Sequence, residues 1–317
     1  MDSTHPLIQA EDLYRYYGKD CAVKGVSVTL NKGEILGFLG PNGAGKSTTM
    51  QMICGNLAPS SGRIRIDGMD LLERPRDAKR LLGYLPENPP LYRELTVDEF
   101  LGYCARLHGI RGGDMRKAVQ HAKEHCGLED VGKRLIGNLS KGFQQRTGIA
   151  QAIVHSPAAI VLDEPTVGLD PIQVRQIRRL IRDLGEDRGI ILSTHILPEV
   201  QESCTRVQII HQGRAVLNDS VAGVLQQMRA CSLILATRSA ANQATLAVID
   251  GVHEVEDLGE NRYRLLFRSD SDPAEQVAET VVKMGWGLLE LSPERRSMEE
   301  IFVEITATDA HGEERAA

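Results

Sequence analysis

The apolar positions in the first two-thirds of the chain form short runs, separated by longer amphipathic stretches. The runs EILGFL (34–39), AAIVLD (158–163) and GIILST (189–194) are almost wholly apolar and predict buried strands. The segments at 96–109 and 172–185 predict helices, and the second has an apolar face formed by Ile177, Leu180, Ile181 and Leu184. Strands that alternate with helices indicate an α/β layered domain.

The pattern changes near residue 220. DSVAGVLQQMRA (219–230) predicts a short linking helix capped by Asp219 or Ser220. After it we expect a strand at 231–238, a helix at 240–249, two strands within 252–268, a helix at 273–285 and a strand at 287–292. This β-α-β-β-α-β order is that of a small split βαβ sandwich, with Val277, Val281 and Met284 on the apolar face of its second helix.

The end of the chain adds one more predicted helix and a tail. SMEEIFVEI (297–305) begins with a capping box formed by Ser297 and Glu300, and DAHGEERAA (309–317) is polar. We therefore expect a domain at 1–220, with a helical subdomain at about 88–157. An accessory α+β domain at 221–308 and a tail at 309–317 would follow.

Composition narrows the class of protein. The chain has 317 residues, of which 42% are hydrophobic and 25% charged, as in a globular protein, and its net charge of −6 gives no overall attraction to nucleic acid or acidic membranes. Its six cysteines include no CxxC pair, which suits a reducing compartment. We see no signal peptide and no run of apolar residues long enough to span a bilayer, so any membrane contact would go through another chain.

A glycine-rich segment, GFLGPNGAGKSTTM (37–50), follows the first predicted strand. Gly40, Gly45, Lys46 and Ser47 match the P-loop pattern G-x-x-x-x-G-K-[ST]. Glycines let the backbone curl so that N–H groups face phosphate oxygens, and a helix that begins at residue 46 would add the positive end of its dipole. The alternative is a glycine-rich turn that only caps a helix.

Two carboxylates end the second apolar run, in AIVLDEPT. Asp163 lies 117 residues after Lys46, at the tip of a predicted buried strand, where it could hold a Mg²⁺ shell. The adjacent Glu164 could orient or deprotonate an attacking water. The alternative is a strand that merely ends in acidic turn residues.

Through these segments and several others, residues 7–220 resemble the ATP-binding cassette (ABC) transporter ATPases. GPNGAGKST resembles the family's Walker A motif, LSKGFQQR (139–146) its signature, VLDEP its Walker B, GLD (168–170) its D-loop and STH (193–195) its switch histidine. Tyr17 resembles the aromatic residue that stacks on adenine. The segments YLPENPPLY, STHILPEV and SMEEIFVEIT look most like bacterial cassettes of the gliding-motility, copper-processing, sodium and multidrug export group.

The resemblance implies a P-loop NTPase fold with a mixed sheet and a helical subdomain, and it implies ATP and Mg²⁺ as cofactors. ATP would contact Tyr17, Gly40, Pro41, Asn42, Gly43, Ala44, Gly45, Lys46, Ser47 and Thr48. Ser47, Asp163 and Glu87 would surround the metal, and Glu164, His195 and Glu87 would be the catalytic residues, with Glu164 as the general base. A second cassette, in a homodimer, would complete each site with Ser140, Gly142, Gln144 and Asp170.

The same resemblance implies where the protein works. It would be the ATPase motor of a bacterial exporter, at the cytoplasmic face of the inner membrane, bound to permease subunits through a groove near Glu87 to Leu95. The other hypotheses are a soluble cassette in translation or DNA repair and a nucleotide sensor that barely hydrolyses. We expect no nucleic acid partner. The transported substrate would be set by the membrane subunits.

Two residues depart from the family pattern. Glu87 stands where glutamine is usual and would add a negative charge beside the metal, unless it is only a hinge residue that faces solvent. Lys141 stands where glycine is usual and would either bring positive charge to the interface or point away from it.

Other residues have simpler alternative interpretations. Ser140 could be an ordinary helix cap, His195 a satisfied turn histidine, and Asp170 the end of a turn before Pro171. Tyr17 could be an ordinary aromatic, with Tyr16 in its place at the adenine. The pair His121 and His125 has metal-ligand spacing but no evident third ligand, and the arginines of RQIRRLIR predict a solvated helix face.

Overall fold

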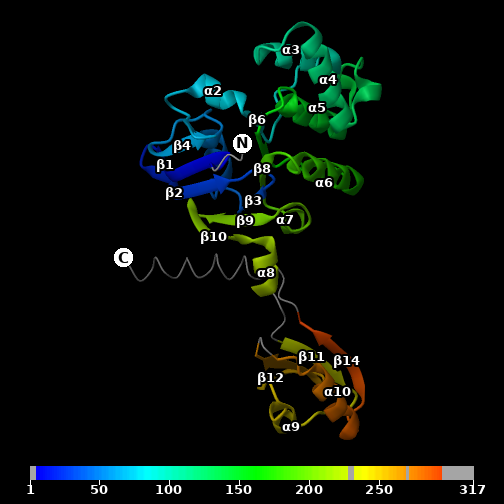
Figure 1. Cartoon of the computed structure of the whole chain (residues 1–317). Coiled ribbons are helices and arrows are strands. Elements are labelled where there is room, and N and C mark those ends of the chain that lie inside the picture. Colours follow the sequence, from blue (N-terminus) through cyan, green and yellow to red (C-terminus); the bar gives the residue numbers. More distant parts are fainter. Residues whose placement is uncertain (1–4, 228–231, 269–270, 295–317) are drawn as a thin grey trace. The chain divides into compact units, whose positions relative to one another are not determined.

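The computed structural model describes residues 5–227, 232–268 and 271–294 (Figure 1). Contacts divide the chain into two compact units, one ending at Ala222 and the other beginning at Gly223. We describe each unit by itself. In the part of the chain that the structure describes, no helix combines the length and the apolar character needed to cross a membrane.

A six-stranded sheet forms the centre of the first unit. Its order is β10-β9-β3-β8-β7-β6, and all neighbours are parallel except β9 and β10. The strands are β3 (Ile35–Leu39), β6 (Leu82–Leu85), β7 (Ala159–Asp163), β8 (Gly189–Thr194), β9 (Arg206–His211) and β10 (Arg214–Ser220). The three apolar runs of the sequence are thus β3, β7 and β8, which lie side by side, and these predictions are confirmed.

Successive side chains of this sheet point to opposite faces and contribute to two separate hydrophobic cores. Ile190 and Leu192 pack with the helices on one face, whereas Ile191 packs with α1 and the N-terminal strands on the other. This burial on both faces explains why the strands read as continuous apolar runs rather than as alternating ones. The helices of the unit are α1 (Lys46–Ile53), α2 (Pro75–Arg80), α3 (Val97–Leu107), α4 (Gly112–Cys126), α5 (Lys141–Ile153), α6 (Pro171–Gly185) and α7 (Leu197–Ser203).

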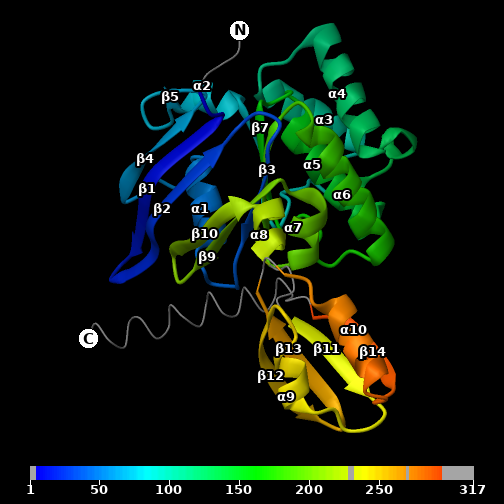
Figure 2. The ribbon, with the colours of Figure 1, turned by 60° about the horizontal axis from the view of Figure 1, so that its bottom comes forward.

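The helices α3, α4 and α5 lie on the opposite side of the six-stranded sheet from the N-terminal strands, as Figures 1 and 2 both show. The predicted helices at 96–109 and 172–185 correspond to α3 and α6 and are confirmed. Thr96 begins α3 with a capping box, because its side chain accepts a hydrogen bond from Glu99 N while the Glu99 carboxylate accepts one from Thr96 N.

A second, antiparallel sheet covers α1, and the apolar pattern did not predict it. Its order is β2-β1-β4-β5, formed by β1 (Ile8–Tyr17), β2 (Asp20–Leu30), β4 (Ser61–Ile66) and β5 (Met69–Asp70). In β1 the buried positions are Ile8, Ala10 and Leu13, so the alternation shifts by one residue after Ala10. Asp12, in this irregular stretch, has a left-handed φ of 49°. This bulge breaks the period of two that would mark a strand in the sequence.

The second unit has the β-α-β-β-α-β order that the sequence predicts. Its elements are β11 (Ser232–Thr237), α9 (Gln243–Ala247), β12 (Val252–Gly259), β13 (Arg262–Phe267), α10 (Ala274–Lys283) and β14 (Leu288–Pro293), preceded along the chain by α8 (Val221–Gln227). The strands pair antiparallel in the order β12-β13-β11-β14. The first strand lies between the third and the fourth, which is the split βαβ arrangement.

Two details of the second unit differ from expectation. The helix expected at 240–249 is shorter, because the Asn242 side chain caps it by accepting a hydrogen bond from Ala244 N. Val277 and Val281 are buried as expected, but Met284 follows the end of α10 and is 55% exposed. The predicted helix at 297–305, its capping box and the tail at 309–317 lie outside the described residues.

Candidate nucleotide site

The loop between β3 and α1 is shaped by glycines at positions where a side chain would collide. A Cβ on Gly40 would overlap the carbonyl oxygen of Ile210, and one on Gly45 would lie 2.7 Å from that of Ala22. Gly43 and Gly45 also have φ values of 81° and 101°, in the left-handed region that glycine adopts freely. The loop therefore needs its glycines both for space and for conformation.

Helix α1 begins at Lys46, directly after this loop, and among the described residues no side chain caps its N-terminus. The first N–H groups of a helix have no partner within the helix, and they carry the positive end of its dipole. Ser47 and Thr48 follow in the same first turn and line the adjoining cavity. An uncapped, glycine-led helix start of this kind binds anions such as phosphate.

Lys46 is buried among oxygen atoms. Its Nζ donates to the carbonyl oxygens of Gly40, at 2.7 Å, and Pro41, at 3.2 Å, and lies 3.7 Å from a carboxylate oxygen of Glu164. Burial lowers the pKa of Lys46, and the opposing attraction of Glu164 and Asp163 favours its charged form. The chain thus holds a cation inside the glycine-rich loop, where phosphate oxygens would gain most from it.

Two acidic residues end β7. Asp163 is 2% exposed, and its Oδ1 has no hydrogen-bond partner within the described residues. Glu164 has a left-handed φ of 49°, and its N–H donates to the carbonyl oxygen of Ser193 in β8 at 2.9 Å. A buried carboxylate oxygen without a partner is unfavourable unless a cation satisfies it, so Asp163 fits the Mg²⁺ that the sequence implies.

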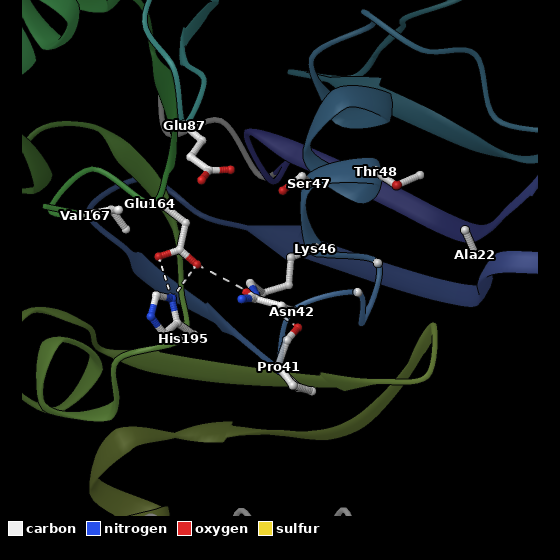
Figure 3. Close-up of a pocket in the computed structure, with 12 residues that line it drawn as sticks. Ala22, Pro41, Asn42, Lys46, Ser47, Thr48, Glu87, Glu164, Val167 and His195 are labelled. Carbon is white, nitrogen blue, oxygen red and sulfur yellow. Dashed lines mark hydrogen bonds and ion pairs between the residues drawn. The ribbon is translucent and has the colours of Figure 1, made fainter.

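Glu164 and His195 are in direct contact. The Nδ1 atom of His195 lies 3.0 Å and 2.9 Å from the two carboxylate oxygens of Glu164. Because a carboxylate can only accept, Nδ1 carries the proton and donates it. Figure 3 shows the Glu164 carboxylate between His195 and Lys46. Glu164 is 7% exposed, whereas the His195 side chain is 46% exposed, so the histidine forms the outer wall.

These groups surround a cavity of about 510 Å³. Glu87 lines it from the side opposite Ser47 and is exposed, so its place beside the metal stays a prediction (Figure 3). The lining residues are Ala22, Pro41, Asn42, Gly43, Gly45, Lys46, Ser47, Thr48, Glu87, Glu164, Val167 and His195. The sequence missed Ala22 and Val167, which carry no reactive group and stand next to motifs rather than in them.

Tyr17, expected at the adenine, lies at the end of β1 and does not line this cavity. Its ring is 48% exposed, and the Arg15 guanidinium lies 4.9 Å from the ring centroid. The neighbouring Tyr16 is equally exposed, at 49%. Ala22, which comes from the same hairpin, does line the cavity. The adenine contact of Tyr17 stays a prediction, as does its alternative, Tyr16, because both rings are exposed on the hairpin that carries Ala22.

The signature residues lie apart from the cavity, at the start of α5. Ser140 caps the helix, and its hydroxyl accepts a hydrogen bond from Phe143 N at 3.4 Å. A Cβ on Gly142 would lie 2.6 Å from the side chain of Gln173. Gln144 uses its amide N–H group to donate to the carbonyl oxygens of Ile136, at 3.2 Å, and Leu139, at 3.0 Å. Within one chain, Gln144 therefore fixes the loop that leads into α5.

Lys141 and Asp170 are close to the signature and to the D-loop segment. The Lys141 ammonium lies so close to Gly168 that a Cβ on Gly168 would overlap it. This side chain therefore packs against the D-loop segment of its own chain. Asp170 caps α6, and its Oδ1 accepts hydrogen bonds from Ile172 N, at 3.0 Å, and Gln173 N, at 2.9 Å. The simpler interpretation of Asp170 as a helix start describes what it does in a single chain.

The histidine pair of α4 and the arginines of α6 lie outside the nucleotide cavity. The rings of His121 and His125 touch, at 3.1 Å between their Nε2 atoms, but no group of three metal-ligating residues occurs in residues 5–227, 232–268 and 271–294. On α6, Arg178 pairs with Glu202 at 2.8 Å and Arg179 with Asp183 at 3.9 Å. Arg179 is exposed, as a solvated helix face predicts, whereas Arg178 is only 13% exposed and differs from that prediction.

Comparisons with known proteins give consistent matches. A family model described as "ABC transporter" matches residues 23–167. The chain is 32% identical to the linearmycin resistance ATP-binding protein LnrL of Bacillus subtilis, over 95% of this chain and 98% of that protein. It is 40% identical to the bacitracin transport ATP-binding protein BcrA of Bacillus licheniformis, over 66% and 68%, and 31% identical to the Nod factor export ATP-binding protein I of Rhizobium sp., over 92% and 94%.

Solved structures give the same picture for the first unit. An ATP-binding subunit of an ABC transporter aligns with a TM-score of 0.63 at 31% identity, covering 70% of this chain and 92% of that one. CbiO1 from Clostridium perfringens, described as part of the transporter complex cbiONQ, aligns with a TM-score of 0.63 at 30% identity, covering 69% and 90%.

Proposed function

This chain belongs to the ABC transporter ATP-binding proteins, and from that premise we propose that it hydrolyses ATP to drive export by separate membrane subunits. The relatives matched over most of this chain are named for linearmycin resistance and for Nod factor export, and a third for bacitracin transport. These names support an exporter. None of them supports the alternative of a soluble cassette in translation or DNA repair.

The observation that carries the proposal is the position of Glu164. Its carboxylate is nearly buried, receives a hydrogen bond from His195 and lies 3.7 Å from Lys46, on the wall of the cavity that the P-loop lines. A carboxylate fixed beside a phosphate cradle can take the proton of a water molecule that attacks the terminal phosphate. We assign Glu164 as this general base.

His195 and Lys46 take the complementary roles. His195 donates through Nδ1 to Glu164, which orients its ring on the wall of the cavity, and we assign the γ-phosphate contact to this histidine. Lys46 neutralises charge on the β- and γ-phosphates, and the N–H groups at the start of α1 bind their oxygens. This arrangement opposes a nucleotide sensor that barely hydrolyses, because such a protein needs no buried base.

We assign Mg²⁺ to Ser47 and Asp163, with Glu87 nearby. The unpartnered Oδ1 of Asp163 and the presence of Ser47 and Glu87 on the cavity wall support this assignment. Bound there, Mg²⁺ would neutralise the charge that develops on the transferred phosphoryl group. The chain's part is to hold Asp163 at the rigid end of β7 and to orient the Ser47 hydroxyl from the first turn of α1.

A second copy of this chain is the partner we propose for each site. Ser140 fixes the first turn of α5, so the positive end of that helix is available to an anion outside the chain's own cavity. Two cassettes facing head to tail would place each signature loop on the other's γ-phosphate. ATP would then close the pair, and hydrolysis would release it.

The membrane subunits would dock near residues 87–95, at the cytoplasmic face of the inner membrane. A cavity of about 260 Å³ supports this position, because it is lined both by the Glu87 segment (Glu87, Asn88, Pro89, Leu91 and Arg93) and by Lys141, Gln144 and Gln145 of the signature helix. A helix bound there would touch both the Glu87 segment and the signature helix. Docking would thereby couple transport to the nucleotide.

We assign residues 1–220 as the ATP-binding domain and 221–308 as an accessory domain that supports the dimer. The division of contacts between Ala222 and Gly223 supports this boundary.

The test is the substitution Glu164→Gln in the full-length chain. Because the amide cannot accept a proton, we expect turnover to fall by about 10²-fold or more with unchanged ATP affinity. The variant should also elute as a dimer in ATP and Mg²⁺ on size exclusion with light scattering. Glu260→Gln is the matched control, since Glu260 is exposed and has a similar left-handed φ of 53°. Turnover close to that of the control would refute our assignment of the base.

A further inference from the structure

Glu199, which belongs to none of the nucleotide motifs, is a buried carboxylate in the first turn of α7. It is 1% exposed. Its Oε1 accepts a hydrogen bond from the Thr166 hydroxyl at 2.5 Å, and its Oε2 accepts one from the Thr194 hydroxyl at 2.9 Å. A buried carboxylate is unfavourable unless hydrogen bonds or a positive charge compensate for the lost water. The hydrogen bonds from Thr166 and Thr194 provide part of this compensation.

The two threonines come from the two loops that carry the proposed catalytic pair. Thr166 lies two residues after Glu164, in the turn that follows β7. Thr194 ends β8 and directly precedes His195. The Thr194 hydroxyl also accepts a hydrogen bond from Ile196 N at 3.1 Å, so the backbone on both sides of His195 is held by one side chain. Glu199 therefore joins the Glu164 loop to the His195 loop.

Arg178 of α6 supplies the positive charge that Glu199 needs. Its guanidinium lies 3.8 Å from Glu199 and 2.8 Å from Glu202, the latter at the surface. The arginine side chain is 13% exposed, so its attraction for Glu199 is screened little by solvent. With this charge beside it, the Glu199 carboxylate accepts one hydroxyl hydrogen bond at each of its two oxygens.

We propose that Glu199 is a positioning residue that sets the distance between Glu164 and His195. The proposal rests on the proposed function, because it assumes that this pair performs the hydrolysis. The Glu164–His195 contact of 2.9 Å joins two separate loops, and productive geometry at such sites tolerates errors of only about 0.5 Å. Glu199 is not among the residues that line the nucleotide cavity, so it acts through the loops alone.

The test uses Thr166, where two substitutions separate the hydroxyl from the volume. Thr166→Val keeps the shape but removes the donor to Glu199, whereas Thr166→Ser keeps the donor. We expect Thr166→Val to lower kcat about tenfold with KM for ATP unchanged, and Thr166→Ser to stay within about twofold of the wild-type chain, by analogy with loss of a supporting contact. Glu199→Gln should match Thr166→Val in steady-state ATPase assays.

Glu202→Gln is the control, since it removes the exposed partner of Arg178 but neither threonine contact. We expect its kcat to stay within about twofold of wild type. If Thr166→Val and Glu199→Gln keep wild-type kcat, or change KM alone, the positioning role is refuted. Should Glu199→Gln fail to fold, the two Thr166 variants decide. Full turnover in Glu164→Gln would instead refute the proposed function, so the two failures are distinguishable.

Discussion

The residues of the nucleotide site fall into two groups with opposite character. The pocket half consists of the P-loop, Glu164 and His195, and the signature half consists of residues 140–144 and 168–170. In the pocket half, side chains contact one another: buried Lys46 faces Glu164, and Glu164 accepts a hydrogen bond from the half-exposed His195. In the signature half, Ser140 and Asp170 hydrogen-bond to the starts of their own helices, as far as the described residues show.

This difference indicates what a single chain can do by itself. The pocket half is assembled within one protomer, with its loops fixed by β7, β8 and α7, so it should bind nucleotide without help. In the signature half, Ser140, Gln144 and Asp170 form hydrogen bonds within their own loops and helix starts, and none of these three residues lines the cavity of the pocket half. We therefore expect changes in the pocket half to alter affinity, and changes in the signature half to alter turnover at unchanged affinity.

The largest effect on affinity should follow Lys46→Ala. Loss of a charged donor to phosphate costs about 1.5–3 kcal/mol, which corresponds to ATP binding weaker by about 10- to 100-fold. A fluorescent ATP analogue titrated into the full-length chain measures this change. Lys32→Ala is the control, because it removes the same charge from an exposed turn. Equal affinity in the two variants would remove the P-loop lysine from the site.

Ser140→Ala should have a smaller effect, and on turnover rather than on ATP affinity. Loss of an N-cap costs about 1 kcal/mol of stability, and loss of the fixed helix start should lower turnover about tenfold while ATP affinity stays unchanged. Thr96→Ala removes the cap of α3 and provides a matched loss of stability away from the nucleotide. Thermal unfolding and ATPase rates of both variants separate the two effects. Equal turnover in both would contradict a role for the signature in hydrolysis.

The smallest effect should follow Glu87→Gln, which introduces the glutamine that is usual at this position in the cassettes that the chain resembles. Glu87 is exposed on the cavity wall and contributes to the charge around Lys46. Without this negative charge, the Mg²⁺ concentration for half-maximal turnover should rise about two- to threefold, as expected for an exposed charge. Glu73→Gln, at an exposed position outside the cavity, is the control. An unchanged Mg²⁺ dependence would separate Glu87 from the metal.

The sequence predicted the parts of the fold in which the local apolar pattern matches the burial of the element in the folded chain. The apolar runs at β3, β7 and β8 are buried on both faces, and the four apolar positions of α6 are all buried. The order of the second unit also followed from pattern alone. The antiparallel sheet was missed, because the bulge at Asp12 interrupts the alternation of β1 and because pairing between distant strands leaves no local signal.

The candidate site could be predicted where its residues belong to recognisable sequence motifs. The P-loop, Glu164 and His195 meet around one cavity, as the resemblance of their motifs to the family implies. Glu199 could not be found in this way, since a glutamate in a short helix is ordinary in sequence. Its partners Thr166 and Thr194 lie 33 and 5 residues away and meet it only in the folded chain. The hydrogen bonds of Gln144 within its own loop were equally invisible.

The left-handed backbone of Glu164 has a consequence for attempts to stabilise this protein. A residue with a side chain is strained at φ near 49°, at a cost of about 1–2 kcal/mol, whereas glycine is not. The fold thus stores strain at the position to which we assign the proton acceptor. Glycine there would relieve the strain, but it would also remove the carboxylate that faces buried Lys46, and with it the proposed chemistry.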